Sequence, residues 1–166
     1  LAIVGRSLLS ELAPLVGAQN GVIYLVEQEI NPRLKLLAAY ADDETAGHPA
    51  QLHMGQGLIG QCALDGRRML ITDLPANARP IRSGLFQAPP NNVVVLPVLY
   101  EGQVKAVIEL GSVGSFTDLQ MAFLEQLTSG IGIVPPPPLH PQRPPRRSNP
   151  PLRHHRRSRH RHHVRP

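Results

Sequence analysis

The sequence predicts an α+β domain in which one antiparallel β-sheet has the N- and C-terminal helices on one face and a short-helix and loop lid on the other. The first supporting pattern is segment 91–110 (NNVVVLPVLYEGQVKAVIEL), which is typical of two strands joined by a tight turn. The second is apolar helical spacing at 1–18 and 116–134. The third is a polar, proline-broken stretch at 75–90 between predicted strands.

Charge divides the chain of 166 residues, with its net charge of +5, into two unlike segments. Residues 1–134 hold 8 Lys and Arg against 12 Asp and Glu, which makes this segment mildly acidic. Residues 135–166 hold 10 Pro, 9 Arg and 6 His but no acidic residue, so they lack the apolar side chains that a core needs. We expect a globular domain at 1–134 and a disordered tail at 135–166.

The first elements are a helix at 1–18 and strands at 22–27 and 34–41. The helix carries an apolar stripe and is closed by Gly17 and by Asn20-Gly21. Asn31-Pro32 marks the turn between the strands, because the residue before proline avoids the helical region. A polar loop follows at 42–50.

The middle of the chain is predicted as a short helix, a strand and a long loop. The helix lies within 54–64 and ends at Asp65-Gly66, and the strand spans 68–74. Four prolines break segment 75–90, and we expect one helical turn there, at 81–86.

The hairpin 91–110 is predicted to form the floor of the domain, with a different role for each face. Alternation in the second strand separates two sets of side chains. We expect the first set to pack against the terminal helices: Val104, Ala106, Ile108 and Leu110. The second set faces the lid: Lys105, Val107 and Glu109.

The last predicted element is a helix at 116–134, for which Thr117 is a suitable N-cap. We expect its buried stripe to hold Leu119, Ala122, Phe123, Leu127 and Ile131.

Reactive residues are too sparse to predict a catalytic site, a metal site or a cofactor. Cys62 is the only cysteine, which excludes an internal disulfide and a cysteine-rich zinc site. We interpret it as a small buried hydrophobe rather than as a redox, metal or bilin site. His48 and His53 lack the spacing that places two ligands on one helical face. No catalytic triad, paired carboxylates or nucleotide-binding glycine box is present.

Location and context are predicted from weaker signals. No apolar run approaches the roughly 20 residues of a membrane span, and a single cysteine suits a reducing compartment. We therefore expect a cytoplasmic protein. The chain begins with Leu rather than Met, and we expect it to be part of a longer one.

Several motifs within 1–134 together resemble one family. They are 55–63 (GQGLIGQCA), 71–74 (ITDL), 95–98 (VLPV) with 105–110 (KAVIEL), and Phe116-Thr117 at the start of the last helix. This set resembles the GAF domain, a PAS-like fold that senses small molecules in bacterial signalling proteins and cyclic-nucleotide phosphodiesterases. Segments 88–90, 92–99 and 101–110 are most similar to GAF domains of bacterial hybrid sensor histidine kinases, which often carry HAMP modules.

The resemblance implies a pocket between the sheet and the segments 55–64 and 75–90. Candidate ligand-binding residues are Leu58, Ile59, Cys62, Arg79, Ile81, Arg82 and Phe86 from the lid, with Val107 and Glu109 from the sheet. Arg79 or Arg82 near Glu109 would suit a polar or anionic ligand. In the other interpretation, both arginines are solvated and Glu109 is tied to a backbone amide. The cyclic-nucleotide signature does not match, because Asn31 and Lys35 are four positions apart.

Two functions fit the resemblance. The chain is a non-catalytic sensory module that binds an unknown small molecule and acts on the kinase domains of a parent protein through its terminal helices. Alternatively, it is a ligand-free dimerisation spacer. Both imply a homodimer through the terminal helices. The tail at 135–166 is interpreted as a frameshift product, and only a genuine tail would bind nucleic acid or an acidic partner.

Overall fold

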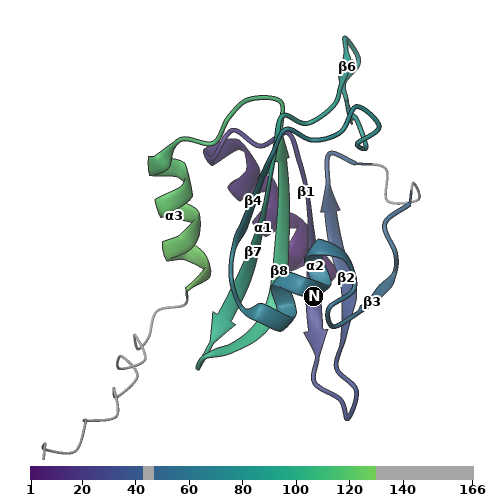
Figure 1. Ribbon diagram of the computed structural model, residues 1–166, viewed down its shortest axis with the longest axis vertical. Helices are drawn as coiled ribbons and strands as arrows, with labels where there is room; N and C mark the ends of the chain where they lie inside the picture. Colours follow the sequence, from purple (N-terminus) through teal and green to yellow (C-terminus); the bar gives the residue numbers. More distant parts are fainter. Residues whose placement is uncertain (43–46, 130–166) are drawn as a thin grey trace, which may run out of the picture. The chain divides into compact units, whose positions relative to one another are not determined.

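The structure, a computed structural model, describes residues 1–42 and 47–129 (Figure 1). The predicted tail therefore lies outside the described residues, as does the end of the predicted last helix. The elements in chain order are α1 (Ala2–Leu15), β1 (Asn20–Glu27), β2 (Arg33–Tyr40), β3 (Gln51–His53), α2 (Gly57–Asp65), β4 (Met69–Thr72), β5 (Ile81–Arg82), β6 (Gln87–Ala88), β7 (Asn92–Tyr100), β8 (Gln103–Ser112) and α3 (Asp118–Thr128).

Six strands form one antiparallel sheet in the order β3-β2-β1-β8-β7-β4. The predicted hairpin is present as β7 and β8, and β8 lies beside β1 at the centre of the sheet. The predicted turn residues Glu101 and Gly102 both adopt positive φ, 51° and 75°. The strand β3 was not predicted, because it has only three residues and pairs with β2 alone.

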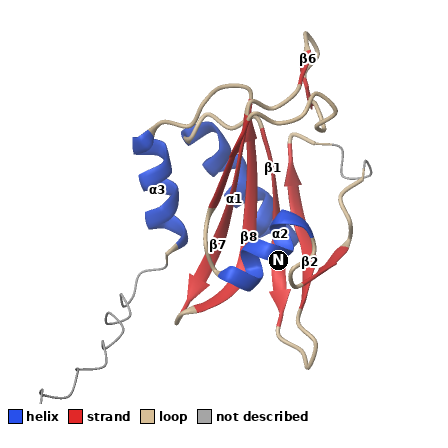
Figure 2. Cartoon of the chain, in the orientation of Figure 1, coloured by secondary structure: helices blue, strands red, loops and turns tan. Residues whose placement is uncertain are grey.

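The helices cover the two faces as predicted, which confirms the α+β fold class. One apolar cluster joins α1 and α3 to the sheet through residues such as Leu9, Leu124 and Ile108. A second cluster, on the opposite face, joins α2 to the sheet through Cys62, Tyr24 and Val107. Figure 2 shows α1 and α2 on opposite sides of the sheet, with α3 at its β7 side. Within the described ranges, no helix is both long and apolar enough to cross a membrane.

The predicted face of Val104 is wrong, because a β-bulge lies next to it in β8. The pairing of β7 with β8 shifts between Val98 and Leu99, so Ala106 lies opposite Val98 and Val104 opposite Leu99, with Lys105 as the extra residue. An inserted residue reverses the alternation of side chains before it. Val104 consequently packs in the α2 cluster, whereas the other three side chains predicted with it face α1 and α3.

The buried side of α3 is also different from the prediction. Its buried residues are Met121, Leu124 and Thr128. Four of the residues predicted for the buried stripe are exposed: Leu119 (81%), Ala122, Phe123 and Leu127. The fifth, Ile131, lies outside the described residues. The Thr128 hydroxyl donates to the carbonyl oxygen of Leu124 at 2.8 Å, so a polar residue is buried with its hydrogen bond made. The N-cap prediction is confirmed, because Thr117 and Gln120 form a reciprocal capping box.

The predicted helical turn at 81–86 is wrong. The segment instead forms a small two-stranded hairpin in which Ile81 pairs with Ala88 and Arg82 with Gln87. The Ser83 amide donates to the Phe86 carbonyl oxygen at 2.8 Å, which closes the turn between the strands. This hairpin projects beyond the end of the main sheet (Figure 1).

Candidate functional site

A cavity of about 190 Å³ lies against the face of the sheet that also carries α2. Its floor comes from the adjacent strands β1, β8 and β7, and its walls come from α2, β4 and three loops. The lining residues are Asn20, Gly21, Val22, Asp42, His48, Leu58, Ile71, Leu74, Ala78, Arg79, Pro90, Val93, Glu109 and Gly111. We call this space the Glu109 cavity.

Glu109 places a carboxylate in the floor of this mostly apolar cavity. It pairs with Val22 of β1 and Val95 of β7 through the backbone, so its strand is held from both sides. Among the described residues, no group donates a hydrogen bond to its carboxylate or forms an ion pair with it. Burial raises the pKa of Glu109 above that of an ordinary glutamate, because the charged form is poorly solvated there.

Tyr24 lies on the same face of the sheet and is fully buried. Its hydroxyl donates to the carbonyl oxygen of Pro49 at 2.9 Å, which ties the loop before β3 to the sheet. Burial raises the Tyr24 pKa, and the nearby Glu109 charge raises it further. The Tyr24 phenol is therefore a neutral group under ordinary conditions.

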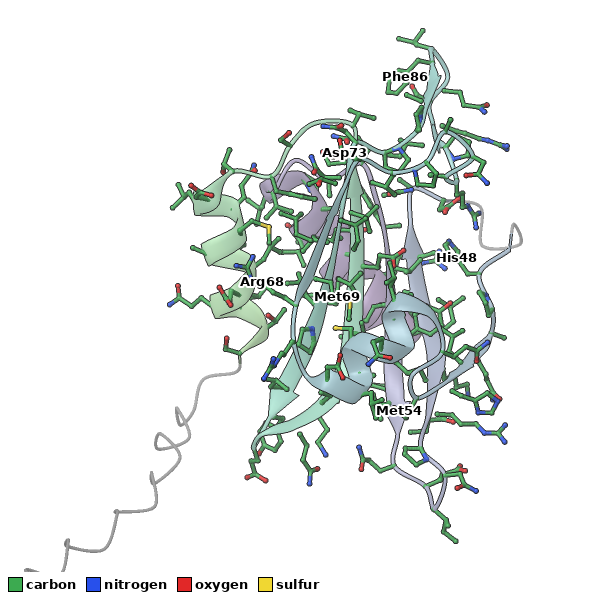
Figure 3. All side chains as sticks on the ribbon, viewed as in Figure 1. His48, Met54, Arg68, Met69, Asp73 and Phe86 are labelled. Atoms are coloured by element: carbon green, nitrogen blue, oxygen red, sulfur yellow. The ribbon has the colours of Figure 1, made fainter. Side chains whose placement is uncertain are left out.

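Three charged or titratable side chains form a second polar group in the cavity wall. Arg79 Nη2 donates to Asp42 Oδ1 at 2.9 Å, and His48 Nε2 donates to Asp42 Oδ2 at 2.9 Å. The bond from Arg79 joins the loop after β4 to the loop after β2, between residues 37 positions apart in the chain. The bond from His48 lies within the loop after β2. The Asp42 carboxylate thus has a basic partner on each oxygen, in contrast to the carboxylate of Glu109. Figure 3 shows His48 on the loop at the outer side of β2.

The structure brings together only part of the predicted site. Leu58, Arg79 and Glu109 line the cavity. Cys62, Val107 and Ile59 pack in the apolar cluster under α2 and are not among the lining residues.

The small hairpin holds the other three predicted residues away from the cavity. Ile81 is buried, Arg82 is exposed, and the Phe86 side chain is 48% exposed at the projecting end of the hairpin (Figure 3). The resemblance had implied that they belong to the lid over the pocket. They lie instead in the segment of β5 and β6, which projects beyond the end of the main sheet (Figure 1).

Two functional candidates, Asp42 and His48, were not predicted as site residues. Both lie in the polar loop after β2, and their link to Arg79 is a contact between segments distant in sequence. Charged residues in such a loop are usually solvated, so the presence of an Asp and a His there did not indicate a binding site. Asn20 and Gly111 were not predicted as lining residues. Asn20 begins β1 and Gly111 lies near the end of β8, outside the lid segments from which most candidates were taken.

The cavity lies beside the end of the sheet at which the chain connects α1 to β1 and β8 to α3. Asn20 pairs with Gly111, and a methyl group added at Gly111 would lie only about 2.3 Å from Asn20 Oδ1. One residue further out, the Ser112 hydroxyl donates to the Gly17 carbonyl oxygen at 2.9 Å, and the Val113 amide donates to Gln19 Oε1 at 2.8 Å. These bonds connect the end of α1 to the segment that leads to α3.

Cys62 is placed as a structural residue. Its side chain is fully buried, and its thiol donates to the carbonyl oxygen of Arg67 at 3.2 Å. Burial, with a smaller contribution from Asp65, raises the pKa of the thiol to about 12. Thiol redox chemistry proceeds through the thiolate, which is therefore scarce at neutral pH.

A protein-family model described as a GAF domain matches residues 1–134. A comparison with curated proteins gives no match.

Solved structures with GAF architecture are similar to the chain at low sequence identity. The GAF domain of an Acinetobacter phosphoenolpyruvate-protein phosphotransferase is 16% identical, with a TM-score of 0.59 over 77% of each chain. A type II free methionine-R-sulfoxide reductase from Thermoplasma acidophilum is 18% identical, with a TM-score of 0.57 over 76% of this chain and 85% of that one. An NreA protein from Staphylococcus aureus, mutated in its nitrate-binding site, is 19% identical, with a TM-score of 0.55 over 71% and 96%. At these identities the likeness concerns the fold alone.

Proposed function

Because the chain belongs to the GAF domain family, we propose that it is a non-catalytic sensory module that binds a small molecule in the Glu109 cavity. The observation that carries this proposal is the cavity itself, a space of about 190 Å³ whose floor holds a carboxylate with no partner among the described residues. The charged form of Glu109 is poorly solvated at this partly buried position, which makes the charge unfavourable there. A bound molecule that supplies the partner would offset this penalty.

The position of the cavity supports a route from ligand to helices. Asn20 and Gly111 line it, and each is within three residues of the hydrogen bonds that join Gly17, Gln19 and Ser112. A ligand that shifts the ends of β1 and β8 would move both helix connections together. Closely packed interiors transmit such small displacements. In this proposal, ligand occupancy biases the positions of α1 and α3.

The exposed apolar side chains of the terminal helices support a homodimer. Ile3 and Val4 on α1 and Leu119 and Phe123 on α3 are exposed, and apolar helix faces of this kind favour a partner. We propose that a second copy covers them, and that the dimer belongs to a cytoplasmic two-component sensor histidine kinase whose activity follows the helix positions. The nucleic-acid alternative depends on the tail, outside the described residues, and stays a prediction.

The alternative is a ligand-free dimerisation spacer. A spacer would have its cavity filled by Phe86, Leu58 and Ile59. Phe86 instead lies on the projecting hairpin, and Leu58 lines the Glu109 cavity without filling it. The enzymatic alternative, a thiol reductase, would need a reactive cysteine, whereas the Cys62 thiol is buried with a raised pKa. Both observations favour the sensory module.

The test is ligand retention by a pair of matched variants. Metabolites that co-purify with the full chain are identified by mass spectrometry, and a metabolite panel is then screened by thermal shift. Ala78→Leu adds a side chain to the cavity wall, and Ala76→Leu makes the same change at an exposed position that does not line it. We expect Ala78→Leu to abolish ligand stabilisation and Ala76→Leu to keep it. Absence of any ligand from the unaltered chain, or equal binding by both variants, would favour the spacer.

A further inference from the structure

We propose that the ligand of the Glu109 cavity is a small organic ammonium ion, a protonated amine with an apolar remainder, whose nitrogen pairs with the Glu109 carboxylate. This inference rests on the proposed sensory function and names the chemical class that the site selects.

The first step is the distribution of charge in the cavity. The Asp42 carboxylate already receives hydrogen bonds from Arg79 and His48, so this polar group is internally compensated. The carboxylate of Glu109 has no such partner among the described residues. An anion entering the cavity would add a second negative charge beside Glu109, whereas an ammonium ion would supply the opposite charge. The charges therefore favour a cation over the anionic ligand expected from the two arginines.

The second step is the size and polarity of the remaining surface. A cavity of about 190 Å³ is slightly larger than the roughly 150 Å³ apolar cavity known to hold a benzene molecule. Leu58, Ile71, Leu74 and Val93 provide an apolar wall for the hydrocarbon part of a ligand of that size. A bare divalent cation is disfavoured, because Ca²⁺ needs six to eight oxygen ligands. The described ranges hold no group of three or more His, Cys, Asp and Glu suited to a metal.

The third step concerns protons. The charged or titratable groups around the Glu109 carboxylate are Tyr24 of β1 and, in the cavity wall, Asp42, His48 and Arg79. Burial raises the Glu109 pKa, and an ammonium ion prefers the ionised carboxylate. Affinity should therefore fall as the pH drops through the raised Glu109 pKa. A neutral ligand held only by the apolar wall would not show this dependence on Glu109.

The experiment compares probes of one shape and different charge on the full chain. Cyclohexylammonium, cyclohexanol and cyclohexanecarboxylate are titrated at neutral pH and followed by the amide NMR signals of Val22 and Gly111. The straight-chain series of propylammonium, propanol and butyrate provides a second shape. We expect each ammonium probe to bind at least about tenfold more tightly than its alcohol and carboxylate counterparts, and its affinity to fall with decreasing pH.

Two substitutions at Glu109 and one control substitution at Glu29 test whether the Glu109 carboxylate distinguishes the probes. Glu109→Gln removes the charge at nearly constant shape and should abolish the preference for ammonium, while Glu29→Gln, at an exposed position on the β1–β2 connection, should retain it. Glu109→Asp keeps the charge and should keep the preference, so a general packing defect at this site is distinguishable.

The outcomes separate the two proposals. Equal binding of the alcohol probes, or a preference for ammonium that survives Glu109→Gln, overturns the ligand class. If a metabolite without an amine binds and Ala78→Leu abolishes that binding, the sensory function stands and the ammonium inference fails. If neither probes nor metabolites bind the full chain, both proposals fail.

Discussion

The burial of α3 leads to a stability prediction in which two leucines three positions apart behave differently. Leu124 is fully buried in the core under α1 and α3, whereas Leu127, one turn further along, is 45% exposed. Leu124→Ala removes buried methyl groups and leaves a cavity, which costs about 2–5 kcal/mol. Leu127→Ala removes few buried contacts and should change the free energy of unfolding by about 0.5–1 kcal/mol at most. Both variants introduce alanine, so helix propensity does not explain a difference between them.

Urea unfolding followed by circular dichroism measures the two effects. A urea dependence of about 1–3 kcal/mol per molar is usual for small proteins. A loss of about 3 kcal/mol therefore lowers the Leu124→Ala midpoint by about 1–3 M, while the Leu127→Ala midpoint moves much less. The measurement is made at low protein concentration, because Leu127 is exposed on α3, a helix proposed to pair with a second copy. Equal shifts, or a larger shift for Leu127→Ala, would show that α3 packs on the side predicted from its sequence.

Three further predictions concern single sites. Because the folded state raises the Glu109 pKa, stability should fall as the pH rises from about 4.3, the ordinary glutamate value, through the raised pKa. Ligand-free Glu109→Gln should therefore unfold at higher urea than the unaltered chain at neutral pH and match it below about pH 4; a less stable variant at neutral pH contradicts this. Gly60→Ala would place a methyl carbon about 2.5 Å from the His53 carbonyl oxygen and should cost about 1–3 kcal/mol, whereas Gly84→Ala enters open space and should leave the thermal midpoint unchanged. The Cys62 thiol should react with Ellman's reagent in urea but only slowly in the native protein at pH 8, and fast native reaction would mean that it is accessible.

Local patterns were sufficient for most elements of this fold. The hairpin β7–β8 has its β-branched run and turn glycine within 21 residues, and α3 has the Thr117 cap at its start. The face of α3 was not predictable in the same way, because both sides carry apolar residues at helical spacing. Leu119, Phe123 and Leu127 look like a better stripe than one that ends in Thr128. Tertiary packing selected the other side, and a backbone hydrogen bond satisfies the buried threonine.

The side chains on each face of β8 and the composition of the candidate site could not be predicted from neighbouring residues alone. A bulge at Lys105 changes the side of Val104, and nothing in the sequence around it marks an extra residue. The place of Glu109 in the cavity lining was predictable, because the alternation of side chains in its strand directs this acid toward the lid. Asp42 and His48 were not predictable as its neighbours, since the bond from Arg79 that brings Asp42 into the cavity wall forms only when two distant loops meet.

The adjacency of β1 and β8 has a mechanical consequence. The chain enters the sheet from α1 at Asn20 and leaves it toward α3 after Ser112, and Asn20 lies opposite Gly111. Tension applied through the two terminal helices therefore acts on one end of an antiparallel pair whose hydrogen bonds run across the strands. Such a pair opens like a zipper, one bond after another, rather than by shearing all its bonds at once. We therefore expect this domain to unfold at low force when its flanking helices are pulled apart.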